Sequence, residues 1–304
     1  MNQLTSQQQG YNAISHALQS KQTTNRICNA LGIDPNDDKA IAEAMPYASS
    51  VKMEIERNFG DGSKDMSTCQ PESIVQCVVD AARYKLMIDG RQHAYLIKYG
   101  NKATLQIGYR GFLHKIKAHF PDACIHYKQI MEGDTFEISS EDGYDTYKHQ
   151  IADALNDEYE KVKGVYVAIS YKVGDKNMQA VTVMSKKMID RVKSSANTST
   201  IWNKWYIEKA IAACIKRACK VHFASIKELH EVINYDNSAT FTPYNNRAPD
   251  VDTQNPFETM NQIKLEKQQD SVTPPNVVAV EGDEAEESIS PASEPDLLLS
   301  LIHI

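Results

Sequence analysis

The stretch HAYLIKYGNKATLQIGYRG, residues 93–111, combines basic and aromatic side chains of the kind that bind a polyanion. Lys98, Lys102 and Arg110 can neutralise phosphates and release their counterions, which supplies much of the affinity for nucleic acids. The tyrosines of the stretch offer aromatic faces on which bases stack without being read. For Tyr95, Tyr99 and Trp205, packing in the protein core stays open as an alternative. The choice between base stacking and core packing therefore depends on how basic and aromatic residues are distributed over the rest of the chain.

Two later segments repeat the mixture at helical spacing. The segment SKKMIDRVKSS begins with a serine that can cap a helix. Its basic residues are Lys186, Lys187, Arg191 and Lys193. On a helical wheel, residues 201–223 have an apolar face that includes Ile215. The opposite face carries Lys209, Lys216, Arg217 and Lys220 with no acidic residue between them. Trp202 joins this basic face if the helix reaches back that far. An ordinary solvated face is the alternative.

The chain lacks the patterns of the common catalytic sites. It has no G-x-x-x-x-G-K-[ST] phosphate loop, and its six cysteines form no C-x-x-C pair or zinc-type cluster. The acidic residues of EGDTFEIS, residues 132–139, are interpreted as solvated strand ends rather than metal ligands. His114, His119 and His126 are interpreted as structural. We therefore predict no catalytic residue, no metal site and no cofactor, and favour a binding protein over an enzyme.

Charge is distributed unevenly, although the formal net charge of the 304 residues is only −7. Residues 91–227 contain 22 basic and 14 acidic residues (net +8), whereas residues 228–304 contain 3 and 15 (net −12). A basic middle beside an acidic end indicates a polyanionic partner. The sequence shows no apolar run of membrane-spanning length and no secretory leader, and its scattered cysteines suit a reducing compartment. We predict a cytoplasmic protein without membrane contact.

Composition and periodicity divide the chain into three parts. Residues 1–25 are rich in Gln, Ser and Asn and are expected to form a flexible terminus. Residues 26–235 are expected to form an α+β core with helices at its N-terminal end. Residues 236–304 hold too many polar and acidic residues to bury a core, so we expect a disordered acidic tail. The acidic tail, which ends in PDLLLSLIHI, could compete with a nucleic acid for the basic surface or serve as a partner-docking segment. The alternative is that its apolar end is without function.

Within the expected core, two hairpins should pack on a long basic helix. Their turns are predicted at Gly100-Asn101 and at Gly174-Asp175. Alternating apolar residues on either side of each turn support the strands. The helix of residues 201–223 is expected to be the longest, with its apolar face on the sheets.

These segments resemble, in order and spacing, the signature of the RecT family of phage and prophage single-strand annealing proteins. HAYLIKYGNKATLQIGYRG is similar to the family's His-Ala-Tyr-Leu strand, Gly-Asn-Lys turn and Gly-Tyr-Arg-Gly strand. IMEGDTFEI, VTVMSKKMIDRVKSSA and WNKWYIEKAIAACIKRACK resemble later family segments. The family usually has an Ala-x-Lys-Thr-like segment early in the last helix, where this chain reads Lys209-Ala-Ile-Ala-Ala-Cys. Whether Lys209 or Lys216 takes over each phosphate contact therefore stays open.

The resemblance implies a Rad52-like annealing core that binds single-stranded DNA and anneals complementary strands in homologous recombination without ATP. It implies a homo-oligomer, either a ring or a helical filament. A phage exonuclease and a host single-strand-binding protein are further candidate partners. Two alternatives stay open: a generic single-stranded DNA-binding protein without annealing activity and, less favoured, a metal-dependent nuclease.

The resemblance also implies which residues contact DNA. The candidates are Lys98, Lys102, Tyr109, Arg110, Lys115, Lys186, Lys187, Arg191, Trp202, Lys204, Lys209, Lys216 and Arg217. Gly108 and Gly111 are interpreted as structural, because a missing Cβ lets another backbone segment approach closely beside the Tyr-Arg pair.

Overall fold

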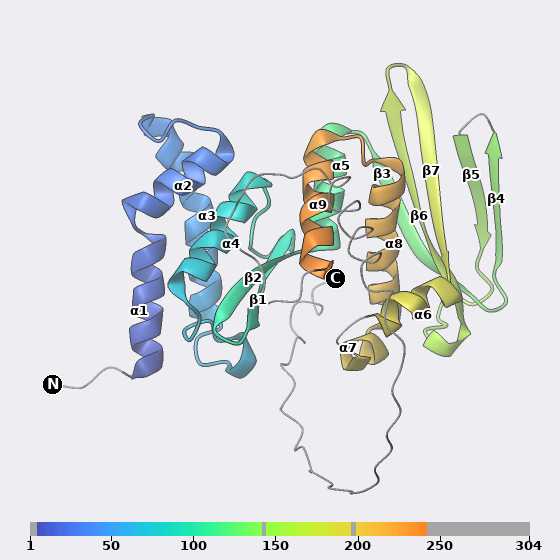
Figure 1. The fold of residues 1–304 in the computed structure, drawn as a ribbon. Helices are drawn as coiled ribbons and strands as arrows, with labels where there is room; N and C mark the ends of the chain where they lie inside the picture. Colours follow the sequence, from blue (N-terminus) through green and yellow to red (C-terminus); the bar gives the residue numbers. More distant parts are fainter. Residues whose placement is uncertain (1–4, 142–143, 196–198, 242–304) are drawn as a thin grey trace, which may run out of the picture. The chain divides into compact units, whose positions relative to one another are not determined.

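The computed structural model describes residues 5–141, 144–195 and 199–241 (Figure 1). The helices are α1 (Ser6–Leu18), α2 (Lys21–Leu31), α3 (Asp38–Arg57), α4 (Pro71–Arg83), α5 (Tyr109–His119), α6 (Lys186–Ser194), α7 (Ser199–Lys204), α8 (Tyr206–His222) and α9 (Lys227–Phe241), with short 3-10 helices η1 (Gly62–Lys64) and η2 (Tyr159–Lys161). The strands are β1 (Ala94–Tyr99), β2 (Lys102–Ile107), β3 (Cys124–Met131), β4 (Thr135–Glu141), β5 (Tyr144–Gln150), β6 (Val162–Val173) and β7 (Lys176–Ser185). This mixture confirms the α+β class. In the described ranges, every helix is too short or too polar to cross a lipid bilayer.

Helices α1 to α4 pack together around α4, whose apolar residues are buried on most of its surface. Ser20 is the N-cap of helix α2, and its Oγ accepts a hydrogen bond from the backbone N–H of Thr23 at 3.1 Å. Such a cap satisfies one of the free donors of the first helical turn. Helix α1 contributes Ile14 and Leu18 to the core. The structure therefore shows packed helices from residue 6 onward, where the polar composition of residues 1–25 had led us to expect a flexible terminus.

Strands β1 and β2 form the first predicted hairpin. Tyr99 pairs with Lys102 across a turn that begins at Gly100, whose φ of 59° lies in the left-handed region that favours glycine. The hairpin packs on α4 through β2. Because β2 ends at Ile107, Tyr109 begins α5 and does not belong to the strand, which corrects the predicted strand assignment of that tyrosine.

Strands β3, β6 and β7 form an antiparallel sheet in the order β3-β6-β7. The second predicted hairpin is β6–β7, in which Val173 pairs with Lys176 around Gly174. Strands β4 and β5 form a separate hairpin that contacts β7, where the Asp145 carboxylate accepts a hydrogen bond from the Val181 N–H at 2.8 Å. Helix α8 covers β6 and β7 (Figure 1).

The helix predicted over residues 201–223 is divided into α7 and α8, which meet at Trp205. Helix α3, with 20 residues, is longer than α8, with 17. The predicted apolar face of α8 is confirmed, because Cys214, Ile215 and Cys219 are fully buried. Helix α9 extends to residue 241, so the first residues of the predicted disordered tail are helical. The remainder of that tail lies outside the described residues.

Candidate nucleic-acid interface

Helix α6 presents a basic face because only its opposite side is apolar. Ser185 occupies the N-cap position with extended backbone, although its side chain makes no capping hydrogen bond. Ile189 is fully buried and anchors the helix against β6 and β7. Lys187 and Arg191 are exposed. None of the ion pairs found between described residues involves either of these two cations.

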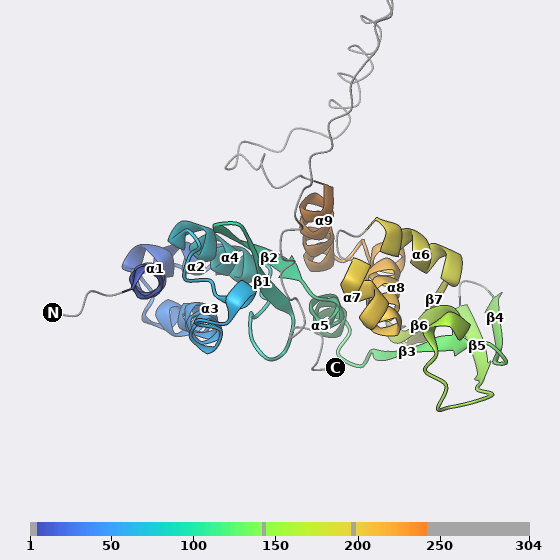
Figure 2. The same cartoon turned by 90° about the horizontal axis from the view of Figure 1, so that it is seen from below.

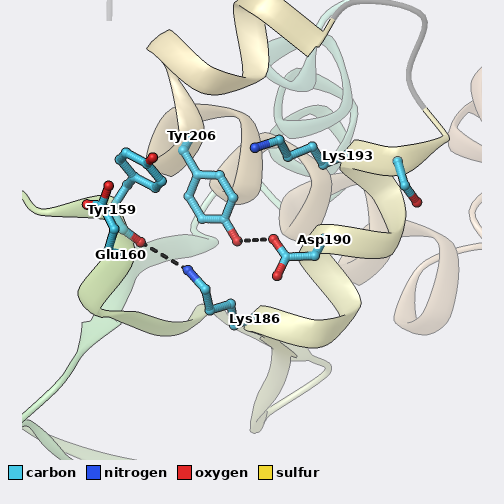
Figure 3. A pocket seen from close by; sticks show the side chains of 7 residues that line it. Tyr159, Glu160, Lys186, Asp190, Lys193 and Tyr206 are labelled. Carbon is cyan, nitrogen blue, oxygen red and sulfur yellow. Dashed lines mark hydrogen bonds between the residues drawn. The ribbon is translucent and has the colours of Figure 1, made fainter.

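Two pockets lie along this helix. The first, of about 640 Å³, is lined by Tyr159, Glu160, Lys186, Asp190, Lys193, Ser194 and Tyr206 (Figure 3). The second, of about 540 Å³, is lined by Lys186, Lys187, Asp190, Arg191 and Ser194. Because the pockets share three lining residues, they form one basic surface, which we call the α6 surface. It brings together three of the predicted DNA-binding residues, Lys186, Lys187 and Arg191.

The Tyr206 ring organises the α6 surface. Its hydroxyl donates a hydrogen bond to Asp190 at 2.7 Å. Burial, assisted by this carboxylate, raises the pKa of Tyr206 well above its ordinary value, so the hydroxyl stays a donor. The ammonium groups of Lys186 and Lys193 lie 5.0 and 5.6 Å from the centre of the ring, within cation–π range (Figure 3). The buried tyrosine therefore orients two lysines, and neither lysine forms an ion pair with another of the described residues, although Glu160 lies in the same pocket.

Tyr159 is the exposed aromatic residue of the same surface. Its ring centre lies 5.7 Å from that of Tyr206, and 43% of the residue is exposed. The Lys186 ammonium donates to the Tyr159 backbone carbonyl at 3.2 Å, which ties helix α6 to η2. An accessible ring beside several cations can hold a base and its phosphate at the same time.

A second group of predicted residues lies at the start of α5. The Nε of Arg110 donates to the Tyr109 hydroxyl at 3.4 Å. Burial raises the pKa of Tyr95 to about 12, with a further contribution from Tyr109. Tyr127 is also near Tyr109, and burial raises its pKa too. Arg110 therefore lies among tyrosine hydroxyls and is half-buried, which leaves it less accessible than Lys187 or Arg191.

The two predicted lysines of the β1–β2 hairpin differ from each other. Lys98 donates to the backbone carbonyl of Asp65 at 2.9 Å and is half-buried. Lys102 is exposed beside the turn. Of the two, Lys102 is therefore the more accessible to a strand of DNA.

Gly108 and Gly111 allow two backbone segments to approach each other. A Cβ on Gly108 would lie 2.6 Å from the carbonyl oxygen of Gln92, and a Cβ on Gly111 would lie 2.5 Å from that of His93. The Gly108 N–H donates to the same His93 carbonyl at 3.0 Å. Any side chain at either position would force the segments apart. The structural interpretation of both glycines is confirmed.

The basic face of α8 is largely engaged within the protein. Asp236 of α9 forms ion pairs with Lys216 at 2.6 Å and with Lys220 at 3.1 Å. Burial, with a smaller effect of Lys216, lowers the pKa of the half-buried Lys209. Arg217 is exposed. The helix has no acidic residue interleaved on this face, but the tertiary structure supplies one from a later segment.

Two predicted residues, Trp202 and Lys115, are buried, whereas Lys204, two positions after Trp202, is exposed. Trp202 is 5% and Lys115 is 6% exposed, and burial lowers the pKa of Lys115. The basic face of α8 does not extend to Trp202, because the helix is interrupted at Trp205. The centre of the Trp202 ring lies 6.2 Å from that of the Tyr206 ring. Lys204 is exposed, with its ammonium 5.8 Å from the Trp205 ring. Trp202 and Lys115 therefore do not reach the surface in the described structure.

Most of the predicted residues thus lie in three places: along α6, on α5 and on α8. Lys98 and Lys102 lie on the β1–β2 hairpin, and Trp202 and Lys204 lie on α7. Neither Arg110 nor Lys216 lines the two pockets of the α6 surface. A common groove that joins the three places stays a prediction.

Sequence reasoning missed several residues. Tyr159 follows a polar loop without periodicity, and only its exposure in the fold distinguishes it. Asp134, which we interpreted as a solvated strand end, has a side chain that is 1% exposed and contacts His149 at 3.0 Å. The carboxylate also accepts hydrogen bonds from the N–H groups of Met131 and Ala152. Asp134 therefore fixes the base of the β4–β5 hairpin.

Among the described residues, no group of three or more His, Cys, Asp or Glu side chains is arranged to hold a metal ion.

Comparison with known proteins places these elements in a family. A comparison with curated protein sequences gives no match. A model of the RecT family matches residues 47–252, a range that includes the β1–β2 hairpin, the α6 surface and helix α8. Because the match covers well over half of the 304 residues, the chain belongs to the RecT family.

Proposed function

We propose that this chain binds single-stranded DNA and anneals complementary strands in homologous recombination, without using ATP. The α6 surface carries the proposal, because its two adjoining pockets combine the exposed ring of Tyr159, which lines the first pocket, with Lys187 and Arg191, which line the second. Lys186 lines both pockets. Membership of the RecT family supports it independently. The absence of a phosphate-loop sequence agrees with annealing that is driven by binding energy alone.

The proposed mechanism is electrostatic and needs no catalytic residue. Two DNA strands repel each other through their phosphates, and bound cations reduce this repulsion. Lys187 and Arg191 contact phosphates, while Tyr159 stacks on a base without reading it. Base edges that are not used by the protein remain available for pairing with a complementary strand. Lys102, Tyr109, Arg110 and Arg217 extend the contact surface along the strand.

Several finer features belong to the same proposal. They are a Rad52-like core over residues 26–235, assembly into a ring or helical filament, and a cytoplasmic location. An exonuclease and a host single-strand-binding protein are the proposed protein partners. Assembly matters physically, because neighbouring subunits can align short basic surfaces into one continuous track.

Annealing of two complementary oligonucleotides with fluorescent labels tests the function. We expect the protein to accelerate pairing in the absence of any nucleotide. If it binds each strand but pairing is no faster than without protein, the chain is a generic single-stranded DNA-binding protein. Shortened strands after incubation with Mg²⁺ would instead indicate a nuclease.

The role of Tyr159 has its own test. Tyr159→Ala should weaken binding to a short oligonucleotide about tenfold, because stacking on an aromatic ring contributes roughly 1–3 kcal/mol per base. Tyr159→Phe should bind as the unmodified protein does. Tyr144→Ala, which removes an exposed tyrosine of β5, is the matched control. Quenching of 2-aminopurine in the oligonucleotide, if equal in the alanine variant and the unmodified protein, would exclude the stacking role.

A further inference from the structure

Helix α9 lies beside α5 and α8 (Figure 2), and its apolar residues belong to the buried core of the protein. Leu229 and Val232 are fully buried, and Ile233 is 6% exposed. The Tyr235 ring lies 5.1 Å from that of Tyr84, and its hydroxyl donates to the Leu105 carbonyl at 3.4 Å. These contacts place the polar residues at the C-terminal end of α9 against the basic face of α8.

A single carboxylate of α9 forms ion pairs with two of the lysines of α8. The Oδ1 of Asp236 accepts from Lys216 at 2.6 Å, and its Oδ2 accepts from Lys220 at 3.1 Å. Asn237 accepts a further hydrogen bond from Lys220 at 2.8 Å. The Asp236 side chain is only 11% exposed, whereas those of the lysines are 25% and 34% exposed. The carboxylate is therefore inserted between two ammonium groups that remain partly accessible to solvent.

This arrangement resembles the contact that a phosphodiester would make. A phosphate offers two unesterified oxygens, which can each accept from one ammonium group, as the two oxygens of Asp236 do. Both ammonium groups keep contact with solvent, which weakens their ion pairs with Asp236, so a polyanion can replace the carboxylate. The Lys216 ammonium also lies 5.2 Å from the centre of the Phe112 ring, which keeps it in place when the carboxylate leaves.

We propose that Asp236 is an internal competitor of DNA phosphate, so that a strand contacts Lys216 and Lys220 only when the carboxylate of α9 is released. The proposal rests on the proposed function, because it assigns a regulator to the same DNA-binding surface. It also goes beyond that function, because α9 then lowers the affinity of the resting protein for DNA. Release of α9 would extend DNA contact from the α6 surface onto α8.

The substitution Asp236→Asn tests the proposal with little change in shape. Full-length variant and unmodified protein are titrated with a fluorescent single-stranded oligonucleotide at several salt concentrations. We expect the variant to bind about fivefold more tightly at low salt, since the carboxylate no longer competes. Glu54→Gln is the matched control, because Glu54 of α3 likewise serves two donors, Arg57 and Asn58. The control removes the same charge and should leave binding unchanged.

Substitution of the two lysines provides a second, independent test of the proposal. In a background of Lys216→Gln and Lys220→Gln, Asp236→Asn should no longer increase the affinity, because the competed cations are gone. Hydrogen–deuterium exchange of the unmodified protein gives a direct readout. The amides at the C-terminal end of α9 should exchange faster when DNA is bound.

The outcomes separate this proposal from the proposed function. If the unmodified protein binds DNA and Asp236→Asn binds with equal or lower affinity, the competitor role is wrong and the ion pairs are structural. Stronger protection of α9 on DNA binding would also overturn it. If neither protein retains an oligonucleotide even at low salt, the proposed DNA-binding function itself fails.

Discussion

Helices α6 and α8 each carry four basic side chains outside their buried face, but their cations have different partners. On α6, two lysines lie over the Tyr206 ring, and Lys187 and Arg191 are exposed. On α8, two lysines share the carboxylate of Asp236, and Lys209 is half-buried. An aromatic ring orients a cation and leaves its charge available, whereas a carboxylate neutralises it. The number of basic residues in a helix therefore does not measure its capacity to bind DNA.

Removal of two charges from each helix should give the largest contrast. Lys187→Gln with Arg191→Gln should weaken binding to single-stranded DNA about a hundredfold, because each charge-assisted contact contributes roughly 1.5 kcal/mol. Lys216→Gln with Lys220→Gln should weaken binding to single-stranded DNA only about fivefold. A phosphate that binds these lysines must first displace the Asp236 carboxylate, so the net contribution of the lysines to the binding free energy is small. Fluorescence anisotropy titrations with one oligonucleotide measure both.

Salt dependence sharpens the same contrast. Loss of two phosphate contacts on α6 should reduce the slope of log affinity against log salt by about 1.4, at roughly 0.7 per contact for single strands. Lys52→Gln with Arg57→Gln on α3 removes equal charge elsewhere and serves as control. Equal losses for the α6 and α8 pairs would remove the distinction between the two helices.

Lowering the pH should reduce the stability of the region around α5 more than that of α6. Burial, and then the His114 ring stacked at 4.4 Å, lower the pKa of His93 to about 4. Between the ordinary value of 6.5 and about 4, the unfolded chain binds a proton that the folded chain does not. The free energy of unfolding should therefore fall as the pH falls through this window, by on the order of 1–2 kcal/mol after allowance for solvent screening.

Native-state hydrogen exchange, corrected for intrinsic rates, measures this effect by region. Protection should decrease in β1 and α5, while α6, which contains no histidine, should change less. His93→Gln should reduce the dependence on pH in this window, and the remaining part should come from His114 and His222, whose pKa values burial also lowers. His16→Gln, at an exposed histidine of α1, should leave it in place. Uniform loss of protection across the chain would argue against a local origin.

A smaller effect concerns the hydroxyl that orders the α6 surface. Tyr206→Phe should lower the free energy of unfolding by about 1 kcal/mol, because the hydrogen bond to Asp190 is lost at a buried site. Tyr159→Phe in the same pocket should change it by less than about 0.5 kcal/mol, as expected for an exposed position. Urea denaturation followed by circular dichroism compares the two. A larger loss in Tyr159→Phe would reverse the roles assigned to these tyrosines.

The smallest expected effect is on the stability of the α8–α9 contact. Asp236→Asn should cost no more than about 1 kcal/mol in unfolding free energy, because both lysines of the ion pairs are partly exposed. Thermal unfolding at low salt is the measurement. A loss several times larger would mean that Asp236 mainly holds α9 in place.

Much of the local structure could be predicted from the sequence. Both hairpins were predicted, because turn glycines at Gly100 and Gly174 lie between alternating strands. The buried face of α8 was predicted from helical periodicity. Periodicity failed at Trp202, since it assumes a continuous helix, whereas the helix is interrupted at Trp205.

The sequence by itself determined the α+β class, both hairpin turns, the apolar face of α8 and the family. These properties depend on neighbouring residues, whose spacing directly encodes a face or a turn. Only the tertiary structure decided that Lys115 is buried, that Tyr159 is exposed beside Tyr206, and that Asp236 neutralises lysines 16 and 20 positions earlier. Such pairings arise when separate elements pack together, and no local periodicity specifies which charges will meet.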